Sequence, residues 1–213
     1  VLKGIEYDTC DRGHILCIMP EGVKMRLLEL RGLPVTALID FVHRHGGILG
    51  PAHPCGEKYL SFTNTKKYYK APEIMKRFDF IEAFNACESE ESNECAMKLA
   101  KKYKKPGIGG SDAHKIECVS MGYTELPEYV TCETELISLI RRKVPIQAGG
   151  TLYGKTTREK MGKAGKILTY SFWFYNKGGE LLRRRKRKVK GEVENPPSPI
   201  DPIEIPYLQK HQQ

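Results

Sequence analysis

Apolar and polar positions alternate in blocks that predict strands followed by helices along the first 150 residues. The strands expected from this pattern are 2–6, 13–19, 48–54, 78–85, 106–114 and 144–148. The helices expected are 33–46, 71–77, 89–104 and 134–142, with a loop at 57–69. Strands that alternate with helices of this length are typical of α/β proteins with a parallel sheet, either open or closed into a barrel.

Two of these segments carry the clearest patterns. The strand at 13–19 is almost continuously apolar after His14, which is typical of a strand buried on both faces of a parallel sheet. The helix at 33–46 has Pro34 near its start, apolar residues at helical spacing, and a glycine pair at its end. Proline at a helix start and glycine just past its end are the usual helix boundaries.

The pattern changes after Gly149, so we divide the chain into a domain at 1–150, an extension at 151–194 and a tail at 195–213. Within the extension, two extended runs separated by Asn176-Lys177-Gly178-Gly179 predict a β-hairpin. The tail has five prolines between residues 195 and 206, which exclude a helix or a central strand. We expect it to lie extended on its own domain or on a second copy of the chain, as a homo-oligomer contact.

Composition excludes several protein classes. The chain has 213 residues, of which 40% are hydrophobic and 29% charged, as in ordinary globular proteins. No apolar run approaches the ~18–20 residues of a membrane span, so no membrane partner is expected. Seven cysteines form an odd set without a Cys-X-X-Cys pair, which argues against zinc-finger and thioredoxin-like motifs. We therefore expect free thiols, mostly buried, and a reducing cytoplasm.

The positive charge is concentrated in one segment. The formal net charge is +9, and seven of the eight residues from Arg183 to Lys190 are basic. Without these seven the net charge is only +2. The run favours a phosphate-rich partner, either nucleic acid or the substrate itself. The alternative is a solvated edge strand whose charges oppose pairing with another sheet.

The residue types that carry chemistry fall at the ends of the predicted strands. These candidates are Glu6, His14, His53, Asp112 and His114. Active sites of α/β folds gather at one rim of the sheet, so we expect these five side chains to converge there. A mixed set of imidazoles and carboxylates suits Zn, Mn or Fe. Taken singly, each has a plainer reading as a surface turn, a core histidine or a surface ion pair.

The same residues lie within motifs that occur in a particular order. The motifs are Gly-Ile-Glu (4–6), Gly-His-Ile-Leu (13–16), Ala-His-Pro (52–54), Ile-Glu-Ala-Phe-Asn (81–85) and Gly-Gly-Ser-Asp-Ala-His (109–114). With them, roughly residues 1–150 resemble the PHP (polymerase and histidinol phosphatase) family of metal-dependent phosphoesterases. The resemblance implies a distorted (β/α)7 PHP-type barrel, N-terminally incomplete in this chain, with up to three divalent metal ions at its C-terminal rim.

The resemblance also implies roles for the five candidates. Glu6 would be a bridging metal carboxylate and His14 a metal imidazole. His53 would bind a metal or contact the phosphate, and Asp112 and His114 would be the last ligand pair. Of these, the catalytic residues would be Glu6, His53 and Asp112.

Glu82 and Asn85 match a strand motif of the family, and we expect them to orient the ligands. The plainer reading of Glu82 and Asn85 is a hydrogen-bonded pair at a strand end. The family's opening His-X-His motif has no counterpart here. We interpret the chain as a fragment whose remaining ligands lie upstream; the alternative is an incomplete, inactive domain.

The activity implied is hydrolysis of small phosphorylated compounds or nucleotides by a metal-activated water. Two alternatives stay open. The first is a nuclease-type PHP module that holds nucleic acid through residues 183–190. The second is a degenerate, non-catalytic domain that binds a partner.

Overall fold

The computed structural model describes residues 2–11, 13–23, 28, 31–56 and 61–153. The chain divides into two compact units, 1–166 and 167–213, and every described element belongs to the first. The predicted hairpin, the basic run and the proline-rich tail lie outside the described residues. Among the helices of the described part, none is long and apolar enough to cross a membrane.

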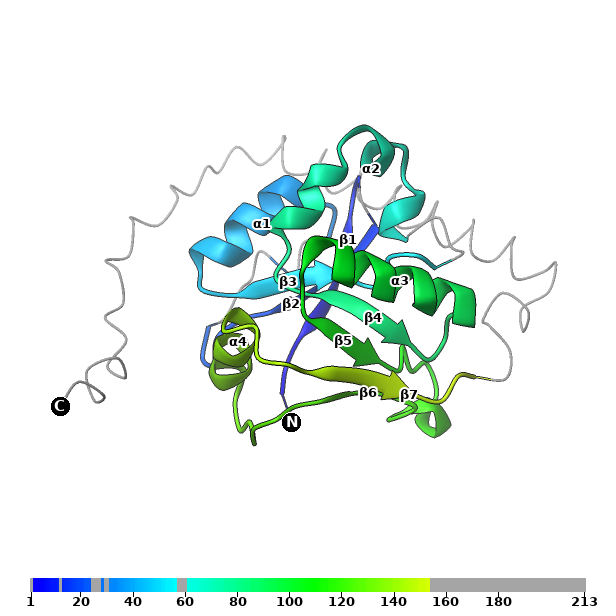
Figure 1. Ribbon diagram of the computed structural model, residues 1–213. Coiled ribbons are helices and arrows are strands. Elements are labelled where there is room, and N and C mark those ends of the chain that lie inside the picture. Colours follow the sequence, from blue (N-terminus) through cyan, green and yellow to red (C-terminus); the bar gives the residue numbers. More distant parts are fainter. Residues whose placement is uncertain (1, 12, 24–27, 29–30, 57–60, 154–213) are drawn as a thin grey trace. The chain divides into compact units, whose positions relative to one another are not determined.

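The described residues form a mixed α/β structure (Figure 1). Its strands are β1 (Ile5–Thr9), β2 (Gly13–Ile18), β3 (Ile48–Pro51), β4 (Ile81–Asn85), β5 (Gly107–Gly110), β6 (Gly122–Glu125) and β7 (Gln147–Gly150). Its α-helices are α1 (Val35–Arg44), α2 (Lys66–Lys70), α3 (Glu90–Tyr103) and α4 (Glu133–Arg141). Short 3-10 helices are η2 (Phe62–Asn64), η3 (Pro72–Arg77) and η4 (Ile116–Cys118).

The predicted helices at 33–46, 89–104 and 134–142 are confirmed to within three residues at each end. The helix predicted at 71–77 is the 3-10 helix η3. The loop expected at 57–69 is wrong in its described part, because η2 and α2 form there. The sequence pattern also missed β6.

The strands pair in three groups. β1, β2 and β3 form an antiparallel sheet, β4 and β5 pair in parallel, and β6 and β7 pair antiparallel. The parallel pairing expected for β2 is therefore wrong. Only a short turn separates β1 from β2, and so short a connection permits an antiparallel hairpin but no parallel crossover. No closed barrel is found among the described residues, so the (β/α)7 barrel is not confirmed.

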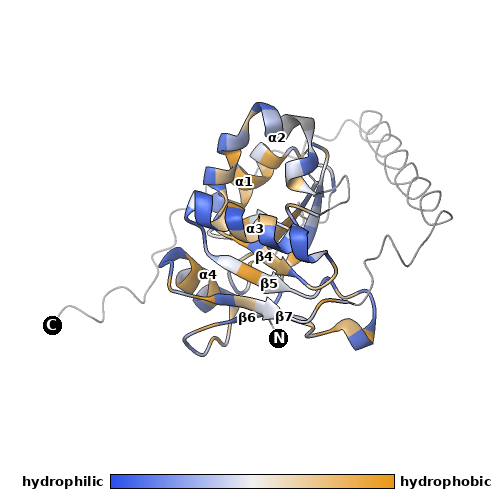
Figure 2. Cartoon of the chain, turned by 45° about the vertical axis from the view of Figure 1, so that its right-hand side comes forward, coloured by the Kyte–Doolittle hydropathy of each residue, from blue (hydrophilic) through white to orange (hydrophobic). Residues whose placement is uncertain are grey.

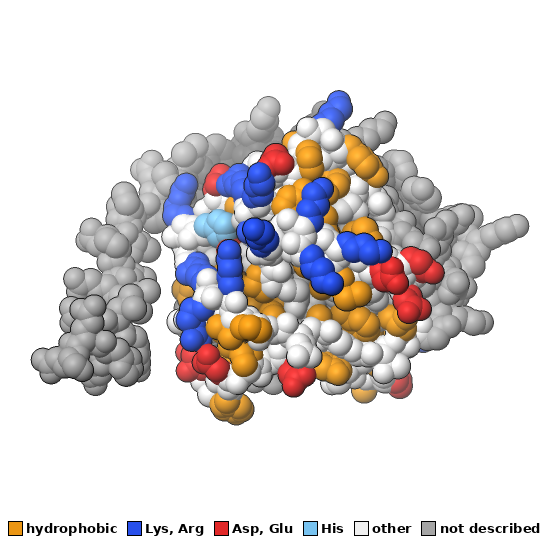
Figure 3. Space-filling model, in the orientation of Figure 1, with side chains coloured by type: hydrophobic (Ala, Val, Ile, Leu, Met, Phe, Trp, Pro, Cys, Tyr) orange, Lys and Arg blue, Asp and Glu red, His pale blue; other side chains and the backbone are white. Residues whose placement is uncertain are grey.

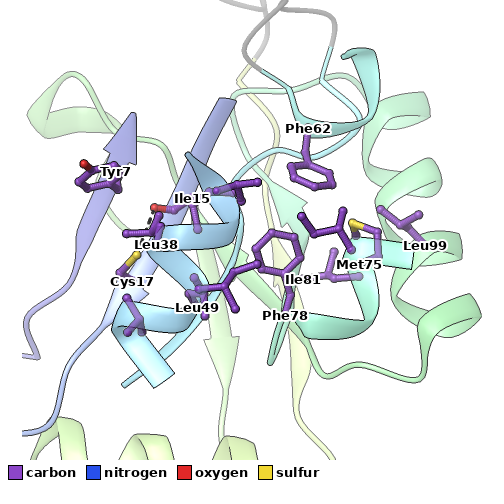
Figure 4. Packing of buried hydrophobic residues seen from close by; sticks show 14 of the residues in the cluster. Tyr7, Ile15, Cys17, Leu38, Leu49, Phe62, Met75, Phe78, Ile81 and Leu99 are labelled. Carbon is purple, nitrogen blue, oxygen red and sulfur yellow. Dashed lines mark hydrogen bonds between the residues drawn. The ribbon is translucent and has the colours of Figure 1, made fainter. Parts of the chain in front are cut away.

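Two apolar clusters hold these sheets and helices together. The larger packs α1, η3 and α3 against the strands, and the edge-to-face pair Phe62–Phe78 lies within it, with ring centroids 5.2 Å apart (Figure 4). The smaller joins α4 to β3 and to Phe80. Figure 2 shows hydrophilic residues along the outer sides of α1 and α3, which leaves their apolar sides for the core.

One cysteine pair corrects the expectation of free thiols. Cys55 and Cys95 form a disulfide, with Cα atoms 6.0 Å apart and a sequence separation of 40. Spacing alone could not identify this pair, since cysteine connectivity depends on the fold. Of the cysteines outside this disulfide, Cys17 and Cys87 are buried as expected, whereas Cys10 is exposed.

Candidate metal centre

Three of the predicted site residues meet at one point. One ligand atom each from Glu6, His14 and His53 lies within 4.8 Å of the other two. Nδ1 of His14 is 2.6 Å from Oε1 of Glu6, and Nε2 of His53 is 3.2 Å from the same oxygen. The two imidazole rings meet edge to face, with centroids 5.4 Å apart. We call these three residues the Glu6–His14–His53 cluster.

Strand register brings the cluster together. In the β1–β2 hairpin Glu6 pairs with Leu16, so His14, two residues away on β2, is its diagonal neighbour on the same face. The opposite face of β2 carries Ile15 into the core. His53 follows the end of β3, and the N–H of Ala52 donates to the carbonyl of His14 at 3.2 Å. The end of β3 therefore places His53 beside His14.

The backbone of His53 is held in an unusual conformation. Its φ is 30°, a sparsely populated region whose occupation costs on the order of 1–3 kcal/mol and that often marks a functional site. Its N–H donates to Oε2 of Glu82 at 2.5 Å, and its carbonyl accepts from the N–H of Gly56 at 3.0 Å. On the ring, Nδ1 lies 3.4 Å from Oγ of Ser61. These contacts leave Nε2 facing Glu6.

Glu6 and His53 in the cluster stabilise the charged forms of one another. Burial favours the neutral form of Glu6, but contacts with His14 and His53 and their charges outweigh it, so the pKa of Glu6 lies far below its usual range. Burial likewise disfavours the charged form of His53, yet Glu6, Glu82 and Asp112 together raise its pKa. Glu6 is therefore an ionised carboxylate at neutral pH, as metal binding requires.

The donor set fits a divalent metal ion. Nδ1 of His14 is buried, and Oε1 of Glu6 lies 2.6 Å from it. Two imidazole nitrogens and a carboxylate oxygen are ligands that zinc and related first-row metals prefer. An ion between these atoms would satisfy both His14 and Glu6.

A cavity of about 220 Å³ opens beside the cluster. Its lining includes Glu6 and His53, and also Glu82 and Asn85 on β4 and Asp112 after β5. The side chain of Asp112 is only 11% exposed. Its charge raises the pKa of both His53 and Glu82. Asp112 therefore belongs to the same electrostatic environment as the cluster.

Of the five predicted site residues, His114 lies neither in the Glu6–His14–His53 cluster nor in the described lining of the cavity. Its side chain is 77% exposed, and Nδ1 lies 2.9 Å from the backbone carbonyl of Asp112. It does not line the cavity within the described structure. The expectation that Asp112 and His114 point the same way assumed an extended backbone. However, β5 ends at Gly110 and Asp112 has a φ of 46°, so the two-residue period does not apply.

Glu82 and Asn85 lie behind the cluster, in the positions expected of residues that orient ligands. Nδ2 of Asn85 donates to Oε2 of Glu82 at 3.1 Å, the same oxygen that accepts from His53. Asn93 on α3 accepts from the N–H of Asn85 at 2.8 Å and donates to its carbonyl at 3.0 Å. Ser61 and Asn93 were not predicted from the sequence. A polar residue on the buried face of α3 was the available signal for Asn93, and Ser61 had none.

Glu82 makes the metal-free protein sensitive to pH. Burial raises the pKa of Glu82 from 4.5 to about 7, although His53 and Asn85 donate to it. A carboxyl with a raised pKa stabilises the fold below its unfolded pKa and loses that contribution as pH rises toward 7. The variant Glu82→Gln should therefore gain stability over wild type at pH 8, by up to about 3 kcal/mol, and gain little at pH 5. Urea denaturation at both pH values measures this difference.

The matched control for that experiment is Glu125→Gln at an exposed position on β6. Its stability relative to wild type should be the same at pH 5 and pH 8. An equal effect of Glu82→Gln at pH 5 and pH 8 would show that burial does not perturb this carboxyl.

The comparisons with known proteins bear on one segment. Residues 90–145, from the start of α3 to the residue before Ile146, match a family model described as PHP-associated. A search of curated proteins finds no match. The matched segment contains Asp112 and His114, whereas the Glu6–His14–His53 cluster precedes it. The match shows that residues 90–145 are similar to a PHP-associated family, and it supports a relation of this chain to PHP-domain proteins.

Proposed function

We propose that this chain contributes to a metal-dependent phosphoester hydrolase. The observation that carries the proposal is the Glu6–His14–His53 cluster, whose ligand atoms lie within 4.8 Å of one another. The phosphoester substrate class comes from the resemblance of the motifs to the PHP family, and the PHP-associated match at residues 90–145 is consistent with it. A distorted (β/α)7 barrel is the arrangement we propose for the complete domain.

Glu6, His14 and His53 would hold the ion, which we propose to be Zn, Mn or Fe on the basis of the donor types. Such an ion lowers the pKa of a bound water and neutralises charge on phosphate oxygens. Asp112 supplies a further carboxylate at the same cavity. Glu82 holds the backbone of His53, so that Nε2 keeps its direction toward Glu6.

The cavity favours a small substrate. Its volume of about 220 Å³ is below the ~300–1,000 Å³ of pockets that enclose a drug-sized ligand. A phosphate group with a small neighbouring moiety fits this volume, as in small phosphorylated compounds or a nucleotide. The nuclease alternative depends on residues 183–190, which lie outside the described residues.

Asp112→Asn tests the proposal with little risk to the fold. Asparagine tolerates the positive φ of this position, but it removes the carboxylate charge. Turnover of p-nitrophenyl phosphate and its bis ester, with Zn²⁺ or Mn²⁺ added, should fall by at least about 100-fold, the scale of losing one electrostatic contribution to catalysis. The melting temperature should stay unchanged.

The control is Asp40→Asn, which alters an exposed ion pair with Arg77 and should leave turnover intact. Full turnover of Asp112→Asn at normal metal occupancy would contradict the assignment of Asp112.

A further inference from the structure

A second pocket, of about 280 Å³, lies where β5 and β7 begin. Two similar segments line it, residues 104–107 after α3 and residues 143–146 after α4. Three of these residues are lysines, Lys104, Lys105 and Lys143, and none of the described residues that line the pocket is acidic. The cavity beside the Glu6–His14–His53 cluster lies at the opposite end of β5, where Gly110 ends the strand and Asp112 follows.

Two of the lysines occupy backbone positions that normally favour glycine. Helix α1 ends with Gly46 at a φ of 76°, the left-handed conformation that glycine adopts without strain. Lys104 after α3 has a φ of 52°, and Lys143 after α4 has a φ of 54°. The same kind of helix end is thus built once with glycine and twice with lysine. Both lysines line the pocket.

Compensation of the helix dipoles does not account for these lysines. A basic side chain near a helix C-terminus is favourable, and each terminus carries about half a negative charge. However, the last turns already hold Lys101 and Lys102 on α3 and Arg141 on α4. The three pocket lysines exceed the charge of two helix ends by roughly two positive units.

Lys105 and Lys143 carry like charges close enough to affect one another. Nζ of Lys105 donates to the carbonyl of Lys76 at 2.8 Å, which fixes its ammonium group. Burial lowers the pKa of Lys105; the charge of Asp79 opposes this shift, and the charge of Lys143 adds a smaller lowering. An anion between these ammonium groups would relieve their repulsion. Figure 3 shows further Lys and Arg side chains on the face seen in Figure 1, which add to the positive field.

We propose that the pocket formed by Lys104, Lys105 and Lys143 binds a phosphate group. Lysine ammonium groups act as point charges that bind phosphate oxygens, and the pocket volume accommodates one such group with part of its carrier. The group could belong to a small phosphorylated molecule or to a nucleic-acid backbone, and the two sources are separable by experiment. This site is independent of the proposed hydrolase function.

The test uses the metal-free full chain, so that a metal ion in the cluster cannot contribute to phosphate binding. Titration with inorganic phosphate and with a six-residue oligodeoxythymidylate is followed by calorimetry at low ionic strength. The variant is Lys104→Gly with Lys143→Gly, which removes two charges and places glycine where the backbone favours it. Binding should weaken at least tenfold, while the melting temperature should not fall.

The matched control, Lys98→Gln with Lys101→Gln, removes the same charge from α3 outside the pocket lining and should change binding less than twofold. Binding of inorganic phosphate identifies a small phosphorylated ligand. Binding of the oligonucleotide alone, with affinity falling steeply as salt rises, identifies a nucleic-acid backbone. The proposal is overturned if neither probe binds, or if the control variant weakens binding as much as the glycine variant.

Discussion

Asparagine in place of His53 is expected to lower the affinity for Zn²⁺ by at least about 100-fold. Loss of a residue that only supports a metal ligand costs about 10–100-fold, and His53 is itself a proposed ligand. Asparagine is chosen because it tolerates the positive φ of this position, which alanine would not. Competition with a chromophoric chelator on the metal-free protein measures the affinity.

The matched control is His43→Asn on α1. His43 is exposed and pairs with Asp79 at 2.9 Å, and it is not part of the Glu6–His14–His53 cluster. Its replacement should change the zinc affinity less than twofold. The same titration on His114→Asn tells whether this exposed histidine contributes once metal is bound. Equal affinities of wild type and His53→Asn would remove His53 from the site.

The second large effect concerns the disulfide between Cys55 and Cys95. A cross-link that closes a loop of 40 residues stabilises a fold by about 4 kcal/mol in the chain-entropy account, within the usual range of 2–4 kcal/mol or slightly above it. Replacing both cysteines by serine should therefore lower the free energy of unfolding by about that amount. Urea denaturation without reductant measures the loss.

Thiol titration of the unreduced, denatured chain checks the disulfide independently. Five of the seven cysteines should react, because two are bonded to each other. The matched control, Cys118→Ser with Cys132→Ser, replaces two half-buried free thiols and should change stability by no more than about 0.5 kcal/mol. Seven reactive thiols, or equal stability of both double variants, would contradict the disulfide.

The helices could be predicted because their ends are encoded locally. Ser89 caps α3 by accepting from the N–H of Ser92 at 3.2 Å, and Gly46 ends α1 with a positive φ. Strand direction is not encoded locally. In β2, Ile15 packs into the larger apolar cluster, whereas Leu16 packs against the smaller one. A strand covered on both faces gives the same apolar run whether its neighbours are parallel or antiparallel.

The candidate site was predictable as a list of residues, and its geometry was not. Glu6 and His14 meet only through the diagonal register of a hairpin, which an expected parallel sheet would not have produced. Asp112 lines the cavity and His114 stays exposed beside it, because the backbone turns after β5. The alternation of side chains along a strand could not predict this turn, because a two-residue period holds only while the chain stays extended.

X-ray absorption at the zinc edge of the zinc-loaded protein tests the central claim most directly. The Glu6–His14–His53 cluster predicts two imidazole nitrogens at about 2.0–2.1 Å, with carboxylate oxygens at about 2.0–2.2 Å. His53→Asn should remove one imidazole from the zinc shell. A shell of thiolate sulfur at about 2.3 Å, or a zinc shell without imidazole, would contradict the account.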